Sequence, residues 1–178
     1  MYLLISSLLL LQFALGFAGQ APLISPEVAD RIGCVRANQI SKTETIKSYR
    51  VTSEYSVNDE GELVKDWKYG FLDDFFPIVE LGPELSADQR DRLLLLLGSP
   101  DTYDLNEMQD CKCCYIESDY GFEFCTSFGS RFVYISLRCG QMYFREADDS
   151  VMMSIWSDSE DLANFIGELF PEMAIRIK

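Results

Sequence analysis

Residues 111–156 read CKCCYIESDYGFEFCTSFGSRFVYISLRCGQMYFREADDSVMMSIW and carry the strongest structural pattern in the chain. Apolar and polar residues alternate along most of this segment, which is typical of strands that bury one face. Turn-forming residues interrupt the alternation at 119–121, 129–130, 139–140 and 147–150. The pattern therefore predicts an antiparallel meander of five strands over about residues 111–156.

These turns place the apolar residues of all the predicted strands on one face of the meander. The set consists of Cys114, Ile116, Phe122, Phe124, Thr126, Val133, Ile135, Leu137, Met142, Phe144, Val151, Met153 and Ile155. A shift of one residue in any strand would move its apolar side chains to the other face, so the agreement among strands supports this register. We expect this face to form the hydrophobic core and helices to pack on it.

A β-hairpin is predicted nearer the N-terminus, over about residues 47–69. Its apolar face would consist of Tyr49, Val51, Tyr55, Val57, Leu63, Trp67 and Tyr69. Residues 58–61, NDEG, have the composition of a turn, with a glycine that can take a positive φ. The segment that follows, FLDDFFPIVELGPEL at 71–85, is aromatic and interrupted by prolines, and the pattern assigns it to no element.

Two helices are predicted from their capping signals and their apolar spacing. Ser86 and Gln89 form a capping box before a leucine run that ends at Gly98. A second capping box at 157–160 begins a closing helix. The apolar side of that helix consists of Leu162, Phe165, Ile166 and Leu169. Together with the sheet, these helices predict an α+β fold with helices packed on one face of the sheet.

Residues 1–18, MYLLISSLLLLQFALGFA, have the form of a cleaved secretory signal. The apolar run is short for a membrane span, which needs about 20 apolar residues. It closes on Gly16-Phe17-Ala18, with small residues at the two positions that a signal peptidase inspects. We therefore expect a signal peptide at 1–18 and a single globular domain at 19–178. The mature protein would be extracellular, or periplasmic in a bacterium, with no membrane association after cleavage.

The composition excludes several classes of function. The chain has a formal net charge of −14, and such an anion is repelled by nucleic acids and by anionic lipid surfaces. It contains no histidine, which removes Ser-His-Asp and Cys-His catalysis and the common histidine zinc sites. Glycine-rich nucleotide-binding motifs are also missing. The sequence therefore predicts no nucleic-acid partner, no cofactor, no metal and no catalytic residue.

The cysteines can be interpreted as disulfides if the chain is exported. They are Cys34, Cys111, Cys113, Cys114, Cys125 and Cys139. An even count behind an export signal predicts up to three bridges. Because the predicted register places Cys113 and Cys125 on neighbouring strands, we expect at least one bridge between Cys125 and the 111–114 cluster. A thiolate metal site and a redox-active site are alternatives for this cluster, although it lacks the Cys-x-x-Cys spacing. Without export, these residues would be unreactive buried thiols.

The opposite face of the predicted meander is unusually aromatic for a solvated surface. It carries Tyr115, Phe132, Tyr134, Tyr143, Met152 and Trp156, with Arg138 and Arg145 among them. Either the hairpin at 47–69 covers this face as a second core, or the face binds a partner, because Tyr, Trp and Arg commonly anchor interfaces. The candidate binding residues are Tyr134, Tyr143, Arg138, Arg145 and Trp156. We expect Trp156 to be the more buried and Tyr143, beside Arg145, the more accessible.

The sequence favours an exported, acidic, non-catalytic module of the inhibitor-like type that binds a protein or a small extracellular ligand. A histidine-free hydrolase that uses a carboxylate pair is the alternative, because two suitably spaced carboxylates suffice for glycoside hydrolysis. Carboxylate pairs occur at Asp73-Asp74, at Asp148-Asp149 and at Asp158 with Glu160 and Asp161. A purely structural secreted component is a third possibility. The sequence does not predict the oligomeric state.

Overall fold

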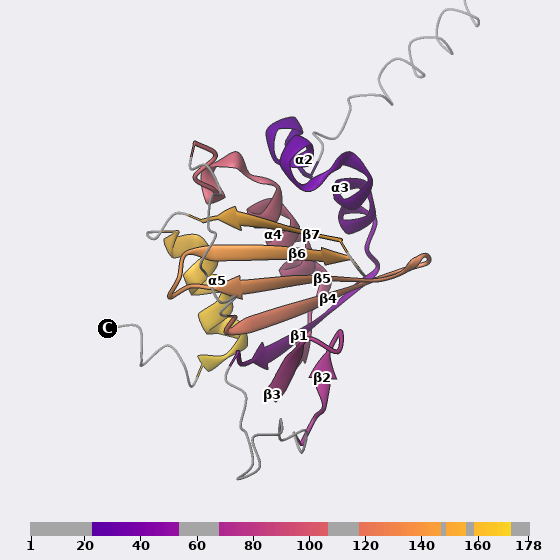
Figure 1. Cartoon of the computed structure of the whole chain (residues 1–178), viewed down its shortest axis with the longest axis vertical. Helices are drawn as coiled ribbons and strands as arrows, with labels where there is room; N and C mark the ends of the chain where they lie inside the picture. The colour runs from indigo at the N-terminus through magenta and orange to yellow at the C-terminus, as the bar shows by residue number, and fades with distance from the viewer. Residues whose placement is uncertain (1–22, 54–67, 107–117, 147–148, 156–158, 172–178) are drawn as a thin grey trace, which may run out of the picture.

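The computed structural model of the chain describes residues 23–53, 68–106, 118–146, 149–155 and 159–171 (Figure 1). The helices in these ranges are α2 (Pro26–Ile32), α3 (Cys34–Ser41), α4 (Ala87–Gly98), the short 3-10 helix η1 (Pro100–Thr102) and α5 (Glu160–Leu169). The strands are β1 (Thr45–Val51), β2 (Phe71–Leu72), β3 (Phe76–Glu84), β4 (Tyr120–Thr126), β5 (Gly129–Ser136), β6 (Gln141–Glu146) and β7 (Asp149–Ser154).

The strands form one seven-stranded antiparallel sheet in the order β2-β3-β1-β4-β5-β6-β7. The sheet is curled into a half-barrel. Helices α4 and α5 lie across one face of it, α2 lies beyond its β7 edge, and α3 leads from α2 toward β1 and contacts β4 (Figure 1). Among the helices of the described ranges, none is long and apolar enough to cross a membrane.

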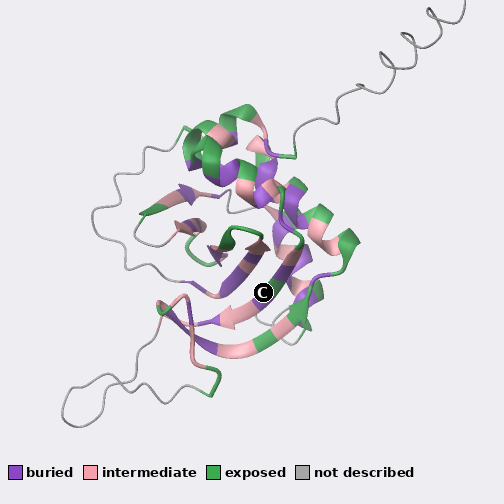
Figure 2. Cartoon of the chain, turned by 90° about the vertical axis from the view of Figure 1, so that its right-hand side faces the viewer, coloured by how far each residue is buried: buried purple, intermediate pink, exposed green. Residues whose placement is uncertain are grey.

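Strands β4 to β7 confirm the core face predicted for them. Phe122 lies opposite Val133, Val133 opposite Phe144, and Phe144 opposite Val151, so these side chains form a row across the four strands. The fully buried members of the face are Phe122, Phe124, Val133, Ile135, Met142 and Phe144. They pack against the buried side chains Leu93, Leu94, Leu97, Leu162, Phe165 and Ile166 of α4 and α5. Figure 2 shows the buried residues, in purple, gathered between the helices and the sheet.

The prediction of a five-stranded meander over residues 111–156 is wrong. The strand beside β4 is β1, which pairs with it from Thr45 opposite Cys125 to Arg50 opposite Tyr120. The turn expected at 119–121 is also absent, because Tyr120 already belongs to β4. Residues 111–117, the predicted first strand, lie outside the described residues. A strand that is distant in sequence thus takes the position that local alternation assigned to a neighbouring one.

The separate N-terminal hairpin over residues 47–69 is also wrong. Its first strand exists as β1, but β1 pairs with β3 on one edge and with β4 on the other. No edge of β1 is therefore left for a return strand. Most of the predicted return strand falls on 54–67, outside the described residues, and Lys68 and Tyr69 lie in a turn.

The true partner of β1 is β3, which comes from the segment that the sequence pattern left without an element. Pro77 and Pro83 interrupt this strand, and its register with β1 shifts at two points. Prolines and bulges are tolerated near the edge of a sheet, where β3 lies. These irregularities remove the regular alternation, so the strand was not detectable from local periodicity.

The predicted capping box of α4 is confirmed. Ser86 Oγ accepts a hydrogen bond from the Gln89 N–H at 3.3 Å, and the Ser86 N–H donates to Gln89 Oε1 at 3.0 Å. The helix ends at Gly98, where a Cβ would lie 1.8 Å from the Leu23 carbonyl oxygen. The close approach lets the Ser25 N–H donate to the Gly98 carbonyl at 2.9 Å. Glycine is thus required where the chain entering α2 crosses the end of α4.

The predicted start of the closing helix is displaced. The residue that precedes α5 is Ser159, and its side chain makes no capping hydrogen bond. Ser157 and Asp158 lie outside the described residues. The predicted apolar stripe is confirmed, because Leu162, Phe165, Ile166 and Leu169 are all buried.

Substitution of Phe165 tests the packing of α5 on the sheet. Because this side chain is fully buried, we expect Phe165→Ala to lower the free energy of unfolding by about 3–5 kcal/mol. The adjacent Asn164 is exposed, and Asn164→Ala should have almost no effect. Urea denaturation of both variants measures the difference, and equal effects at the two positions would contradict the packing described.

Candidate functional site

The candidate binding residues from the sequence are only partly brought together. Tyr134 on β5 lies opposite Tyr143 on β6, with 6.5 Å between their ring centroids. Arg145 follows Tyr143 on the same side of β6. Arg138 is exposed in the turn between β5 and β6, at the end of β6 away from Arg145. Trp156 lies outside the described residues.

The outer face that carries these residues is covered by β2 and the turn that follows it. Tyr134 is fully buried, and its hydroxyl donates to the Leu72 carbonyl at 3.1 Å. Arg145 pairs with Asp73, and its guanidinium lies 4.4 Å from the ring centroid of Phe75. The second core on this face consists of Val51, Leu72, Phe76, Ile78 and Tyr134. Most of the hairpin expected to form this cover lies outside the described residues.

The turn over the outer face has an unusual backbone. Asp73 and Asp74 both have φ of 52°, in the left-handed region that Asp tolerates better than most residues. The conformation turns the chain back so that Asp73 reaches Arg145, while Phe75 stacks beside the half-buried Tyr143 at a centroid distance of 6.3 Å. This face is therefore largely closed by the chain itself.

A polar network joins β1, β4 and β5 on the same face. The Glu123 carboxylate accepts hydrogen bonds from Ser130 Oγ at 2.6 Å, Tyr49 Oη at 2.9 Å and Lys47 Nζ at 3.2 Å. Burial alone would raise the pKa of Glu123, but these hydrogen bonds and the charge of Lys47 lower it overall. The ionised carboxylate thus stabilises the pairing of the three strands.

Within the described ranges, Cys34 at the start of α3 and Cys125 on β4 are free thiols, and Cys139 is exposed in the β5–β6 turn. Cys125 lies opposite Thr45 and Ser130, on β1 and β5. The neighbouring-strand argument for a Cys113–Cys125 bridge does not hold, because the strands on the two sides of β4 are β1 and β5. The bridge itself stays a prediction. Cys111, Cys113 and Cys114 lie outside the described residues.

The last strand, β7, leaves part of its backbone open along the edge of the sheet. The Ile155 N–H donates to the Gly140 carbonyl at 2.8 Å, so the backbone groups of Ile155 point toward β6. Along an antiparallel strand, the backbone groups of successive residues point alternately to its two sides. The N–H and C=O groups of Ser150 and Met152 therefore point away from β6, toward the outer edge of the sheet. Their outward groups have no hydrogen-bond partner among the described residues.

One end of this edge is already occupied by a short stretch of the chain. Tyr103 forms an antiparallel bridge with Ile155, and the Asp104 N–H donates to the Ser154 carbonyl at 3.1 Å. The chain then leaves β7 in a turn at Leu105 and Asn106, where the Asn106 N–H donates to the Asp104 carboxylate at 3.0 Å. The C-terminal end of β7 thus already pairs with an antiparallel stretch of chain. Beyond the turn, the edge beside Met152 is open.

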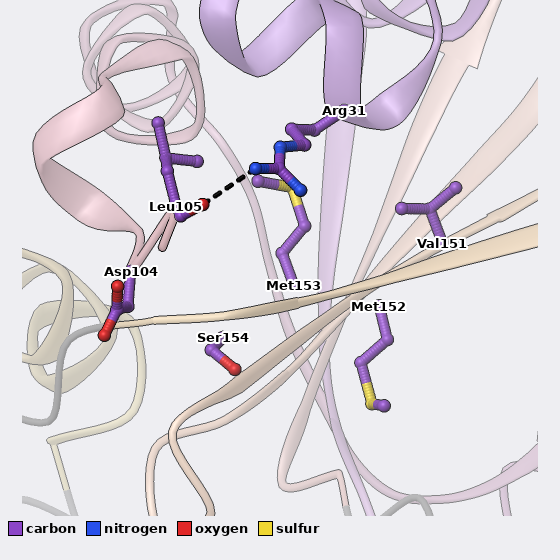
Figure 3. A pocket seen from close by; sticks show the side chains of 7 residues that line it. All are labelled: Arg31, Asp104, Leu105, Val151, Met152, Met153 and Ser154. Atoms are coloured by element: carbon purple, nitrogen blue, oxygen red, sulfur yellow. Dashed lines mark hydrogen bonds between the residues drawn. The ribbon is translucent and has the colours of Figure 1, made fainter. Parts of the chain in front are cut away.

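Two cavities follow the open edge. The first, of about 150 Å³, is lined by Arg31, residues 104–105 and residues 151–154. The second, of about 260 Å³, lies between the α2–α3 junction and the start of β7. Both are lined by Arg31 and Val151, so together they form one groove, which we call the β7 groove. Figure 3 shows Arg31 reaching from α2 into the space between Leu105 and Val151.

Arg31 differs from most arginines of the structure in having no ion pair within the described ranges. Six arginines pair with described carboxylates, namely Arg36, Arg50, Arg90, Arg92, Arg131 and Arg145, and Arg138 also has an interaction partner. The Arg31 guanidinium instead donates to the Leu105 carbonyl at 2.8 Å. The positively charged Arg31 side chain therefore extends into the β7 groove, where its hydrogen-bond acceptor is an uncharged carbonyl.

The two edges of the sheet are protected to different degrees. Natural sheets discourage pairing at open edges with charged residues, prolines and bulges. Where β3 extends past β2, it carries Glu80, Pro83 and Glu84. From Ser150 to Ser154, β7 has neither a charge nor a proline, and its register with β6 is continuous. The β7 edge is thus the one better suited to accept another strand.

The β7 groove was not found from the sequence. Alternation correctly assigned the buried side chains of β7, but it does not indicate which backbone groups lack a partner. One signal was available, namely the absence of charged residues from Ser150 to Ser154 in a chain that is otherwise rich in acids.

Comparison of the chain with protein-family models, curated proteins and solved structures gives no match.

Amide hydrogen exchange tests the orientation of the β7 backbone. We expect the amide hydrogens of Ser150 and Met152 to exchange faster than those of Val151 and Met153, because the latter two donate to β6. Residue-resolved exchange measured by NMR gives the comparison. Protection of Met152 equal to that of Met153 would show that the edge is covered.

The Glu123 network predicts a pH-dependent contribution to stability. Because the folded-state pKa of Glu123 is lowered, its stabilisation is present above the unfolded-state pKa and is lost as the pH falls through the folded-state value. Glu123→Gln should lower the free energy of unfolding at neutral pH by about 1–3 kcal/mol. The difference from the wild type should shrink progressively as the pH is lowered below the ordinary glutamate pKa of 4.5, as measured by urea denaturation over a pH series. Exposed Glu44→Gln is the control, and a loss independent of pH would contradict the network.

Proposed function

We propose that this protein is a non-catalytic binding module that takes up an extended segment of a partner protein along the β7 edge. The observation that carries the proposal is the set of outward N–H and C=O groups of Ser150 and Met152, which lack partners among the described residues. Met152 lines the β7 groove, and Ser150 lies next to Val151, which lines both of its cavities. Strand addition would satisfy these groups, because an extended peptide presents donors and acceptors at the matching spacing.

The energetics favour a partner that also uses the cavities. Main-chain hydrogen bonds contribute about 0.5–1.5 kcal/mol each, so the four outward groups would supply roughly 2–6 kcal/mol. Further affinity would come from side chains of the partner that enter the cavities of about 150 and 260 Å³ on either side of Arg31. These terms fit a transient complex of moderate affinity.

We place this partner outside the cytoplasm. Residues 1–18 have the form of a secretory signal, and the net charge of −14 disfavours nucleic acids and anionic lipid surfaces. The proposed partner is therefore an extracellular protein, or a periplasmic one if the source is bacterial.

The alternative, a histidine-free hydrolase, has less support. Such an enzyme needs two carboxylates that face the reacting bond and can exchange protons. Asp73 is paired with Arg145 and Asp149 with Arg36, whereas Asp148 lies outside the described residues. Asp73 and Asp149 are thus engaged in structural ion pairs, whereas Asp74 is exposed. Glu160 and Asp161 lie in the first turn of α5, where negative charge is favoured.

The proposal is tested by NMR titration with the peptide acetyl-Thr-Val-Thr-Gln-Thr-Val-Thr-amide, which has strong strand propensity and no charge. We expect the amide signals of Ser150 and Met152 to shift. Met152→Pro should abolish this binding, because it removes an outward donor while leaving the hydrogen bonds to β6 in place.

Met152→Val is the matched control, because it keeps the N–H and should keep the binding. Thermal melting checks that both variants fold. Equal binding by Met152→Pro and the wild type, or shifts confined to elements other than β7 and α2, would contradict the proposal.

A further inference from the structure

We propose that the strand bound along β7 carries an acidic side chain, Asp or Glu, in its interior, and that Arg31 recognises this carboxylate. The inference rests on the proposed function, because it specifies the chemistry of the same groove. It starts from Arg31, a cation beside open backbone groups that makes no ion pair within the described ranges.

The donors of Arg31 are only partly used. A guanidinium presents several N–H donors in a planar fork that matches a carboxylate. Arg31 uses this fork for one hydrogen bond, from Nη2 to the Leu105 carbonyl at 2.8 Å. A carboxylate in the β7 groove would satisfy the remaining donors with charge-assisted hydrogen bonds.

The other charges of the groove do not compete strongly for Arg31. Asp149 is paired with Arg36 at 2.9 Å, and Glu146 with Arg131 at 2.6 Å. Asp104 accepts the Asn106 N–H, and Asp30 is exposed on α2 at the rim of the second cavity. Arg36 is itself only 5% exposed and already bound, so Arg31 is the cation of the lining that is accessible to a ligand.

The position of Arg31 indicates a side chain rather than the end of a chain. The cavities lie on both sides of Arg31 and both are lined by Val151, so a strand that pairs with Ser150 and Met152 would continue past the guanidinium in both directions. A terminal carboxylate would leave one cavity unused. Because alternate residues share a face, the residues two before and two after the acid would enter the two cavities.

The experiment compares three peptides that differ only at the central residue. They are acetyl-Thr-Val-Thr-Glu-Thr-Val-Thr-amide and its Gln and Lys analogues, in which both valines share a face with the central residue. Dissociation constants and shifts of the Ser150 and Met152 amides are measured by NMR titration. We expect the wild type to bind the Glu peptide about tenfold more tightly than the Gln peptide. The Lys peptide should bind most weakly, although the net charge of −14 would favour it if long-range attraction dominated.

Two arginine variants isolate the role of the guanidinium. Arg31→Met keeps the aliphatic stem and should reduce the Glu-to-Gln preference to about onefold. Arg92→Met removes the same charge from α4, where Arg92 pairs with Glu168 outside the groove, and should leave the preference intact. Arg31→Lys should retain part of the preference, because it keeps the charge but loses the planar fork. Thermal melting checks the fold of each variant.

The outcomes separate this inference from the proposed function. If the Glu and Gln peptides bind the wild type equally and shift the β7 amides, the acidic specificity is wrong and the strand addition stands. If the Lys peptide binds most tightly, the role of Arg31 is overturned as well. If no peptide shifts the Ser150 and Met152 amides, the proposed function fails and this inference fails with it.

Discussion

Strand β1 joins the two halves of the chain into a single sheet. It pairs with β3 on one edge and with β4 on the other, where the buried Ile46 lies opposite Phe124. The Thr43 hydroxyl reinforces the junction by donating to the Cys125 carbonyl at 2.9 Å, across 82 residues of sequence. Closing so long a loop costs chain entropy that only the completed core offsets. Without β1, β4 would become an open edge and β2–β3 would have no sheet to join.

The sequence predicted the residues whose environment is local and missed those that depend on distant partners. The row from Phe122 to Val151 followed from alternation and turns alone, because a strand shifted by one residue would expose its apolar side chains. β3 was missed because Pro77 and Pro83 break its alternation, and its role depends on β1. The β7 groove likewise depends on residues that are remote in sequence. These residues determine that Arg31 makes no ion pair and that backbone groups of β7 lack a partner within the described ranges. The cover over Tyr134 likewise comes from a turn whose two left-handed residues carry no apolar pattern.

Both faces of the central strands are covered, so the backbone groups that the sheet leaves open lie at its edge. The helices bury one side of β5 through Val133, and β2 with its turn buries the other side through Tyr134. What β7 offers at the edge is mainly main-chain polarity, which does not depend on the identity of its side chains. Under the proposed function, Arg31 and the two cavities beside it would discriminate between partner sequences.

The net negative charge of the chain also affects self-association at the open β7 edge. An uncharged, regular strand at the margin of a sheet can pair with the same strand of another copy as well as with a partner. A net charge of −14 on each molecule opposes that encounter through mutual repulsion, and salt shortens the range of the repulsion to about 8 Å under physiological conditions. The repulsion disappears as the pH approaches the isoelectric point of 4.3. Charge therefore sets the range of pH and ionic strength over which the protein remains colloidally stable, and so tolerates an open edge.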